Sequence, residues 1–177
     1  MLVVGFDTAT PAVSVALHDG ERVASEAFAA DARRHGELLA PMIAEVMADA
    51  GASRADLTAV AVGVGPGPYT GLRVGVVTAR VLGAVLGIPV HGVCSLDLIA
   101  AVASLSVAPG RQFLGATDAR RKEVYWARYD AAGGRLDGPL VGSAGSIAGA
   151  AELAVAGSHL RRPDAREPGP PKRVTPS

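Results

Sequence analysis

The sequence has few aromatic residues, a single cysteine and no net charge. These shortages limit the side chains that can fill a core, exclude an internal disulfide and argue against a general attraction to nucleic acid. Its 177 residues include one Trp, three Tyr and three Phe, so small aliphatic side chains must fill most of a core drawn from 49% apolar residues. The lone Cys94 cannot form an internal disulfide, which fits a reducing compartment. With 17 basic and 17 acidic residues, no global field favours nucleic acid, so any RNA contact must be local or made by a partner.

Long uninterrupted apolar runs are also missing. The N-terminus lacks a basic region and Asp7 interrupts its apolar start, so we do not expect a signal peptide. The longest apolar stretch, 72–90, contains Arg73 and Arg80, which argues against a membrane span. We therefore expect a cytoplasmic protein with no membrane partner.

Motifs for metal binding and nucleophilic catalysis are absent. No two histidines stand four residues apart, and neither an HExxH motif nor paired cysteines occur. Cys94 and Ser95 lie near Asp97, but no G-x-S-x-G elbow surrounds them, and a strand end with a helix cap explains them better. We predict no catalytic residue, no metal site and no cofactor.

Apolar periodicity predicts three strands, then a helix, a strand, a helix, a strand and a helix, followed by a smaller strand-rich part. The expected strands are 2–7, 12–17, 22–28, 57–64, 90–93, 112–117, 123–129 and 139–141. The expected helices are 33–50, 70–86 and 95–105, with a weakly helical segment at 143–156. Thr70 and Ser95 are the expected N-caps, Gly87 an expected helix end, and Pro41 an expected kink or new start.

This order predicts an α/β protein with a mixed sheet of the actin-like, ribonuclease-H-like (ASKHA) type, flanked by helices. We expect a first lobe at 1–107, a small and incomplete second lobe at 108–160, and an irregular tail rich in Pro and Arg at 161–177.

A ridge of small residues runs along the helix expected at 70–86. Every fourth position is small: Gly71, Gly75, Ala79, Gly83 and Gly87. Each interior glycine costs up to about 1 kcal/mol relative to alanine, and close approach of another backbone is the usual compensation. A neighbouring apolar stripe contains Val74, Val77, Val81 and Val85. Spacing alone leaves open whether the ridge contacts the chain's own sheet, its own 33–50 helix or a partner.

Two turns resemble phosphate-binding loops in outline. Asp7 and Thr8 follow the first strand, where an actin-like kinase would place them near a nucleotide, but Ala9 replaces the glycine such a turn uses. The loop 65–68 precedes a helix but lacks Lys-Ser/Thr, and its two prolines remove N–H donors. A structural role is favoured for both, with an actin-like kinase or a peptidase-like enzyme kept as the alternative.

A basic cluster lies in the connection expected after residue 117. Arg120, Arg121 and Lys122 follow one another between two acidic residues, Asp118 and Glu123. The cluster fits an exposed, solvated hairpin, and a local phosphate contact stays open as a second interpretation.

Several segments together resemble the TsaB family, the dimerisation subunit of the bacterial tRNA threonylcarbamoyladenosine complex. The segments, in chain order, are 6–10, 14–17, 34–41, 63–75 and 118–125, with 160–164 resembling the family's closing segment. The run from Gly63 to Gly75 is the most specific of them.

The resemblance implies an actin-like fold, no catalysis by this chain, and a heterodimer with its catalytic homologue TsaD through the helices 33–50 and 70–86. It also implies the ATPase TsaE as a further partner, a homodimer when TsaD is absent, and tRNA contact only through the complex. The interface residues it implies are His35, Leu38, Leu39, Met42, Thr70, Gly71, Arg73, Val74, Gly75, Thr78, Ala79, Leu82 and Gly83. Relatives carry several tens of residues where this chain has the short bridge 142–158, so the second lobe is expected to be incomplete.

Overall fold

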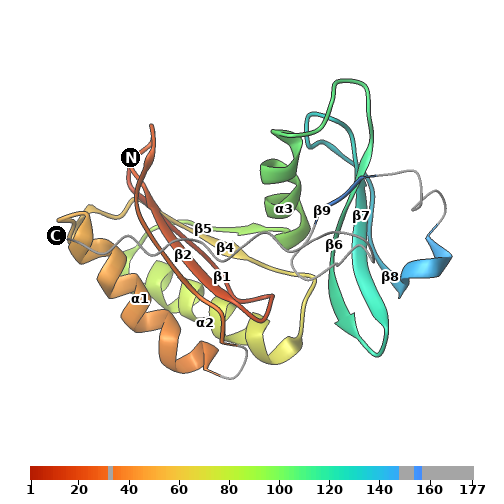
Figure 1. Cartoon of the computed structure of the whole chain (residues 1–177). Coiled ribbons are helices and arrows are strands. Elements are labelled where there is room, and N and C mark those ends of the chain that lie inside the picture. Colours follow the sequence, from red (N-terminus) through yellow and green to blue (C-terminus); the bar gives the residue numbers. More distant parts are fainter. Residues whose placement is uncertain (32–33, 148–153, 157–177) are drawn as a thin grey trace, which may run out of the picture.

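The computed structural model describes residues 1–31, 34–147 and 154–156, which form two sheets joined by a helix (Figure 1). The first sheet and its helices comprise β1 (Val3–Asp7), β2 (Val13–His18), β3 (Val23–Ala29), α1 (His35–Asp49), η1 (Arg54–Asp56), β4 (Ala59–Gly63), α2 (Tyr69–Leu86) and β5 (Val90–Val93). The second part comprises α3 (Ser95–Ser104), β6 (Phe113–Arg120), β7 (Glu123–Tyr129), β8 (Arg135–Ser143), η2 (Ala144–Ser146) and β9 (Ala154–Ala156). The expected tail at 161–177 and the closing segment at 160–164 lie outside the described residues.

The first sheet has the strand order β3-β2-β1-β4-β5. β1, β2 and β3 pair antiparallel, as their short connections allow. After the crossover helix α1, β4 pairs with β1 in parallel, and after the crossover helix α2, β5 pairs with β4 in parallel. The expected mixed sheet of actin-like type is therefore confirmed.

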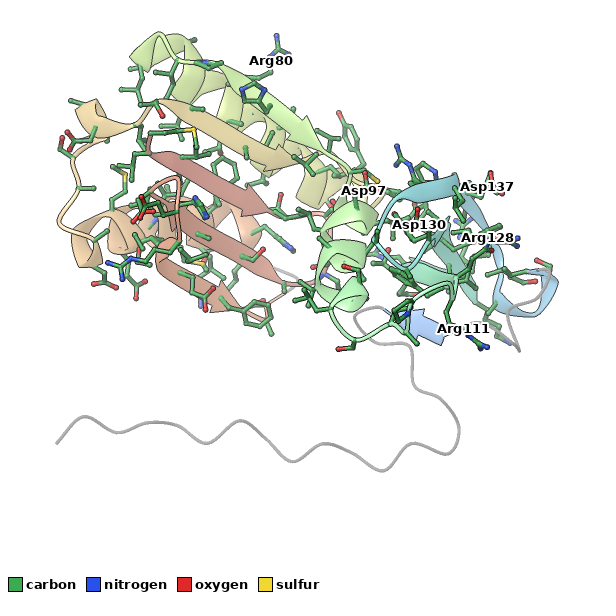
Figure 2. The ribbon with its side chains drawn as sticks, turned by 90° about the horizontal axis from the view of Figure 1, so that it is seen from above. Arg80, Asp97, Arg111, Arg128, Asp130 and Asp137 are labelled. Atoms are coloured by element: carbon green, nitrogen blue, oxygen red, sulfur yellow. The ribbon has the colours of Figure 1, made fainter. Side chains whose placement is uncertain are left out.

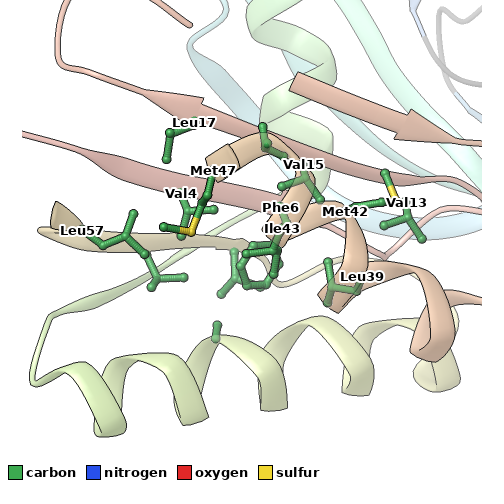
Figure 3. Packing of buried hydrophobic residues seen from close by; sticks show 14 residues of the cluster. Val4, Phe6, Val13, Val15, Leu17, Leu39, Met42, Ile43, Met47 and Leu57 are labelled. Carbon is green, nitrogen blue, oxygen red and sulfur yellow. The ribbon is translucent and has the colours of Figure 1, made fainter. Parts of the chain in front are cut away.

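Both crossover helices cover the same face of this sheet (Figure 1). α1 lies on β2 and β3, and α2 lies mainly on β4. The side chains between them are apolar, and the buried ones come from alternate positions of the strands and one side of α1 (Figure 3). They include Val4, Phe6, Val13, Val15, Leu17, Leu39, Met42, Ile43, Val46, Val60 and Val62.

The second sheet repeats the start of the first. Its order β8-β7-β6-β9 corresponds to β3-β2-β1-β4, with β9 parallel to β6 as β4 is to β1. Only residues 144–153 connect β8 to β9, whereas residues 30–58 connect β3 to β4 and include α1. An incomplete second lobe stays a prediction, which this difference in length motivates. The expected weak helix at 143–156 is wrong where it overlaps β9, because pairing with β6 overrides the local preference of an Ala-rich segment.

α3 packs on the second sheet around two stacked rings. Phe113 and Tyr129 lie with ring centroids 5.5 Å apart, and both side chains are fully buried. The Tyr129 hydroxyl donates a 2.8 Å hydrogen bond to Asp97, which stands on α3 between the two sheets (Figure 2). Arg135 at the start of β8 lies 3.4 Å from the same carboxylate. These contacts attach the second sheet to α3.

Three expected helix features differ from the structure. α2 begins at Tyr69 after Pro68, so Thr70 is not its N-cap, and Pro68 has the extended backbone that precedes a helix. Cys94, not Ser95, is the N-cap residue of α3. α1 continues through Pro41 as one helix, although a proline at its seventh residue has no N–H to donate to the Glu37 carbonyl. Gly87 ends α2 in the left-handed conformation, as expected.

α2 has the length and composition of a membrane-crossing helix, despite its two arginines. Length and composition do not distinguish such a helix from one that packs in a protein core, and α2 lies along the sheet with one face buried.

Candidate partner interface

The glycine loop after β4 packs directly on the turn after β1. A side chain at Gly67 would collide with the Ala9 carbonyl oxygen, and one at Gly63 would collide with the Asp7 carboxylate. That carboxylate accepts a hydrogen bond from the Ala9 N–H and so closes its own turn. The chain's own backbone fills the space that a bound phosphate would need between the two turns. This geometry agrees with the structural role favoured for Asp7, and its placement near a nucleotide stays the alternative.

Thr8 is buried beneath α2 and does not face a ligand site. Its hydroxyl donates a 2.9 Å hydrogen bond to the Gly71 carbonyl and accepts one of 3.2 Å from the Gly75 N–H. His35, at the start of α1, places Nε2 2.9 Å from the Thr10 carbonyl oxygen. The turn after β1 thus fixes the beginnings of both helices.

The ridge of small residues faces the chain's own sheet. Gly71, Gly75, Ala79 and Gly83 are the buried residues of α2. A side chain at Gly75 would meet Thr8 Oγ1 at 2.6 Å, and one at Gly83 would collide with Val90. Of the neighbours that spacing left open, the chain's own sheet takes the close approach that these glycines permit.

The exposed face of α2 carries the valine stripe instead. Val77, Val81 and Val85 are 52%, 55% and 76% exposed and lie at four-residue spacing on one side of the helix. A groove of about 540 Å³ runs between α1 and α2 beside Thr78 and Leu82. Its α1 side is lined by Ala40, Ile43, Ala44, Met47 and Ala48. An apolar stripe beside an apolar groove is typical of a surface that another helix covers.

Known proteins resemble this chain in sequence and in fold. A family model described as TsaD, tRNA N6-adenosine threonylcarbamoyltransferase, matches residues 24–162. The tRNA threonylcarbamoyladenosine biosynthesis protein TsaB of Escherichia coli is 38% identical over 129 residues, which cover 73% of this chain and 55% of that protein. The chain belongs to the TsaB family.

An uncharacterized protein of Mycobacterium tuberculosis is 48% identical over 167 residues, covering 88% of this chain and 72% of that protein. A crystal structure from Pseudomonas aeruginosa, described as similar to peptidase YeaZ, superposes with a TM-score of 0.75 at 30% identity, covering 83% of this chain and 68% of that one. This family member spans little more than half the length of the TsaB proteins of E. coli and Bacillus subtilis, at 55% and 58%.

Only part of the interface expected from the TsaB resemblance reaches the surface. Six of the expected residues are buried in this chain's own fold: Leu39, Met42, Gly71, Gly75, Ala79 and Gly83. His35, Leu38, Val74, Thr78 and Leu82 are half-buried, and Thr70 and Arg73 are exposed. Thr78 and Leu82 line the groove. Arg73 lies 5.8 Å from the centre of the Tyr69 ring.

The valine stripe was present in the sequence as a signal. Val77, Val81 and Val85 each stand two residues after a member of the small-residue ridge, which is about 200° around the helix, so the two stripes lie on opposite sides of α2. The glycines of the ridge permit the closest approach to α2, and the chain's own sheet occupies that side of the helix. The exposed stripe is the one left for a partner.

A second hollow lies on the sheet face that no crossover helix covers. It measures about 570 Å³ and has a floor of small residues, including Gly5, Ala16 and Ala61. The charged residues among its lining are Asp7 and Glu26, and neither Lys nor Arg is present there. A phosphate group would meet carboxylates in this hollow and no cation from its described walls.

The described residues hold no group of three side chains suited to a metal ion. The Ser95 hydroxyl is 2% exposed and accepts a 3.2 Å hydrogen bond from the Gly65 N–H, so it supports the glycine loop. Ser95 is therefore not arranged as a nucleophile.

Proposed function

We propose that this chain is a non-catalytic subunit that binds and supports the threonylcarbamoyltransferase TsaD. In this role it takes part in forming threonylcarbamoyladenosine beside the anticodon of tRNA, in the cytoplasm, with TsaE as a further partner. Membership of the TsaB family supports the pathway, since curated members are named for threonylcarbamoyladenosine biosynthesis. The alternative, an actin-like kinase or peptidase-like enzyme, finds less support in the filled phosphate loop and the buried Ser95.

The valine stripe of α2 is the observation that carries the proposal. Three exposed valines at four-residue spacing lie along one helix, and a groove between α1 and α2 runs beside them. A partner helix laid along this surface would bury apolar area from both helices at once, with helix axes about 8–10 Å apart. The alanines at positions 40, 44 and 48 keep the α1 side shallow enough for such an approach.

The same surface explains the expected homodimer. An isolated chain leaves the stripe in water, and a second copy can cover it with the same residues in a two-fold arrangement. TsaD and the second copy would then compete for one surface.

Val81→Glu tests the proposal, because it puts a charge in the middle of the stripe without disturbing a buried residue. We expect this variant to fold normally and to lose co-elution with TsaD in size-exclusion chromatography. Val102→Glu is the matched control, since Val102 is 71% exposed on α3 and lies outside the stripe. The proposal fails if Val81→Glu and the control bind TsaD equally well.

The enzymatic alternative has its own measurement. The purified chain is incubated with ATP, and turnover is compared with that of Asp7→Ala. ATP hydrolysis that depends on Asp7 would overturn the non-catalytic assignment.

A further inference from the structure

The hairpin between β6 and β7 ends in three basic residues with left-handed backbone conformation. The φ angles of Arg120, Arg121 and Lys122 are 65°, 53° and 66°. Arg120 pairs with Glu123, so Arg121 and Lys122 alone form the connection. A two-residue hairpin turn with positive φ at both positions is of type I′, where Asn-Gly is the strongly preferred pair.

Basic residues are an unfavourable choice at these positions. A Cβ atom is crowded in the left-handed region of backbone conformation. Glycine avoids this crowding because it has no Cβ, and Asn or Asp offsets it with local hydrogen bonds, whereas Arg and Lys do neither. The three side chains are exposed, so burial does not offset this cost. The Arg120 N–H donates a 3.1 Å hydrogen bond to the Asp118 carboxylate, and this contact holds the backbone and not the basic groups. Because packing does not offset the backbone strain at residues 120–122, this strain points to a function of the side chains themselves.

The three cations are available for a ligand. The ion pairs seen in the described part of the chain join Arg22 to Asp19, Arg34 to Glu37 and Arg135 to Asp97. Neither Asp118 nor Glu123 forms an ion pair with the turn there, although both are close in sequence. The turn stands at the lower edge of the molecule in Figure 1, where β6 and β7 of the second sheet meet.

The surroundings of the turn favour a polyanion over a protein surface. Protein interfaces are built on buried apolar or aromatic anchors, and the turn carries none among Asp118–Glu123. A nucleic acid backbone is instead held by exposed Lys and Arg side chains, without apolar anchors or base contacts.

We propose that Arg120, Arg121 and Lys122, here called the basic turn, bind the phosphate backbone of RNA, namely the tRNA substrate. This proposal rests on the proposed function, which supplies the RNA. It departs from the expectation that tRNA is contacted only through the rest of the complex. Contacts to phosphates carry no base preference, so the basic turn positions the tRNA and leaves sequence recognition to other groups.

The test is the double variant Arg121→Asn/Lys122→Gly, which installs the preferred type I′ pair while removing two cations. Binding of an unmodified tRNA transcript is followed by fluorescence anisotropy, with the full chain alone and with its TsaD complex. If two phosphate contacts are lost, affinity at 0.1 M salt falls roughly 25- to 60-fold, and the slope of log K against log salt becomes shallower by about 1.4–1.8. The melting temperature of the same variant is expected to rise, because the strain is relieved.

The control variant Arg22→Gln/Arg111→Gln removes the same charge elsewhere. Arg22 lies at the turn before β3, and Arg111 precedes β6 at the opposite end from the basic turn. We expect its tRNA affinity to stay within about twofold of the wild type, because long-range charge is screened at this salt concentration.

Each outcome decides between the two proposals. Unchanged tRNA affinity in the double variant, or no measurable tRNA binding by either wild-type sample, overturns the basic turn as an RNA site while TsaD binding still supports the proposed function. Loss of TsaD binding with unchanged tRNA affinity reassigns the turn to a protein contact and also overturns the proposal. Failure of the wild-type chain to bind TsaD counts against the proposed function, whatever the double variant shows.

Discussion

Thr8 and Gly75 join β1 to α2 through a single hydroxyl group. Thr8 Oγ1 accepts the Gly75 N–H at 3.2 Å and donates to the carbonyl of Gly71, one turn earlier, at 2.9 Å. The missing side chain of Gly75 lets the helix approach this closely, since a Cβ there would lie 2.6 Å from the hydroxyl oxygen. The glycines that looked like a partner surface are therefore part of the chain's own helix–sheet contact.

Gly75→Leu is expected to destabilise the isolated chain by about 1–3 kcal/mol, because the leucine would force α2 away from Thr8 and Val62. The measurement is urea unfolding of the purified chain without TsaD. Gly36→Leu is the matched control, since no atom lies within 4 Å of a Cβ at that position of α1. Equal midpoints for the two variants would contradict the internal role of the ridge.

Thr8→Val keeps the shape of the side chain and removes its hydroxyl. We expect a loss of about 1–3 kcal/mol in the free energy of unfolding, because a buried site loses both hydrogen bonds to α2. Thr8→Ser keeps the hydroxyl and loses a methyl group, so it is expected to cost only about 0.8 kcal/mol. A Thr8→Val variant as stable as Thr8→Ser would show that the hydroxyl contributes little.

The first sheet could be predicted from the sequence because its signals are local. Alternating apolar residues in 12–17 and the continuous apolar run around Val60 specify strands, and four-residue spacing specifies α1 and α2. Gly87 marks a helix end for a local reason too, since its left-handed conformation favours glycine.

The remaining features depend on contacts between distant residues. β9 becomes a strand because β6 offers it an edge, which its own sequence does not encode. The neighbour of Gly75 is Thr8, 67 residues earlier, and periodicity in one helix cannot identify it. The strain of the basic turn likewise appears only once Arg120 is seen to pair with Glu123.

Ser95→Ala is expected to cost about 1–3 kcal/mol, because it leaves the buried Gly65 N–H without its 3.2 Å acceptor. Thermal unfolding followed by circular dichroism measures the change. Ser104→Ala is the control, since Ser104 bonds the Ala101 carbonyl at the exposed end of α3 and should change stability by less than about 0.5 kcal/mol. A Ser95→Ala variant of wild-type stability would remove the supporting role assigned to this hydroxyl.

Tyr129→Phe is expected to change how stability depends on alkaline pH. Burial, and then the hydrogen bond to the Asp97 carboxylate, raise the pKa of Tyr129 well above its ordinary value of about 10. Below pH 10 the hydroxyl is protonated in both states, so its contribution to stability is fully present. Above pH 10 the unfolded chain releases this proton first, so the contribution is lost as pH rises toward the raised pKa.

Urea unfolding of wild type and Tyr129→Phe between pH 8 and pH 11 measures this difference. At pH 8 the variant is expected to be less stable by about 1.5–3 kcal/mol, because a hydrogen bond to a charged group is lost. Between pH 10 and 11 the difference in the free energy of unfolding between the two proteins is expected to narrow, since only the wild type has this phenol to deprotonate on unfolding. Tyr69→Phe, at an exposed position of α2, should leave the wild-type pH dependence in place. A gap that stays constant from pH 8 to 11 would show that Tyr129 does not couple folding to proton release.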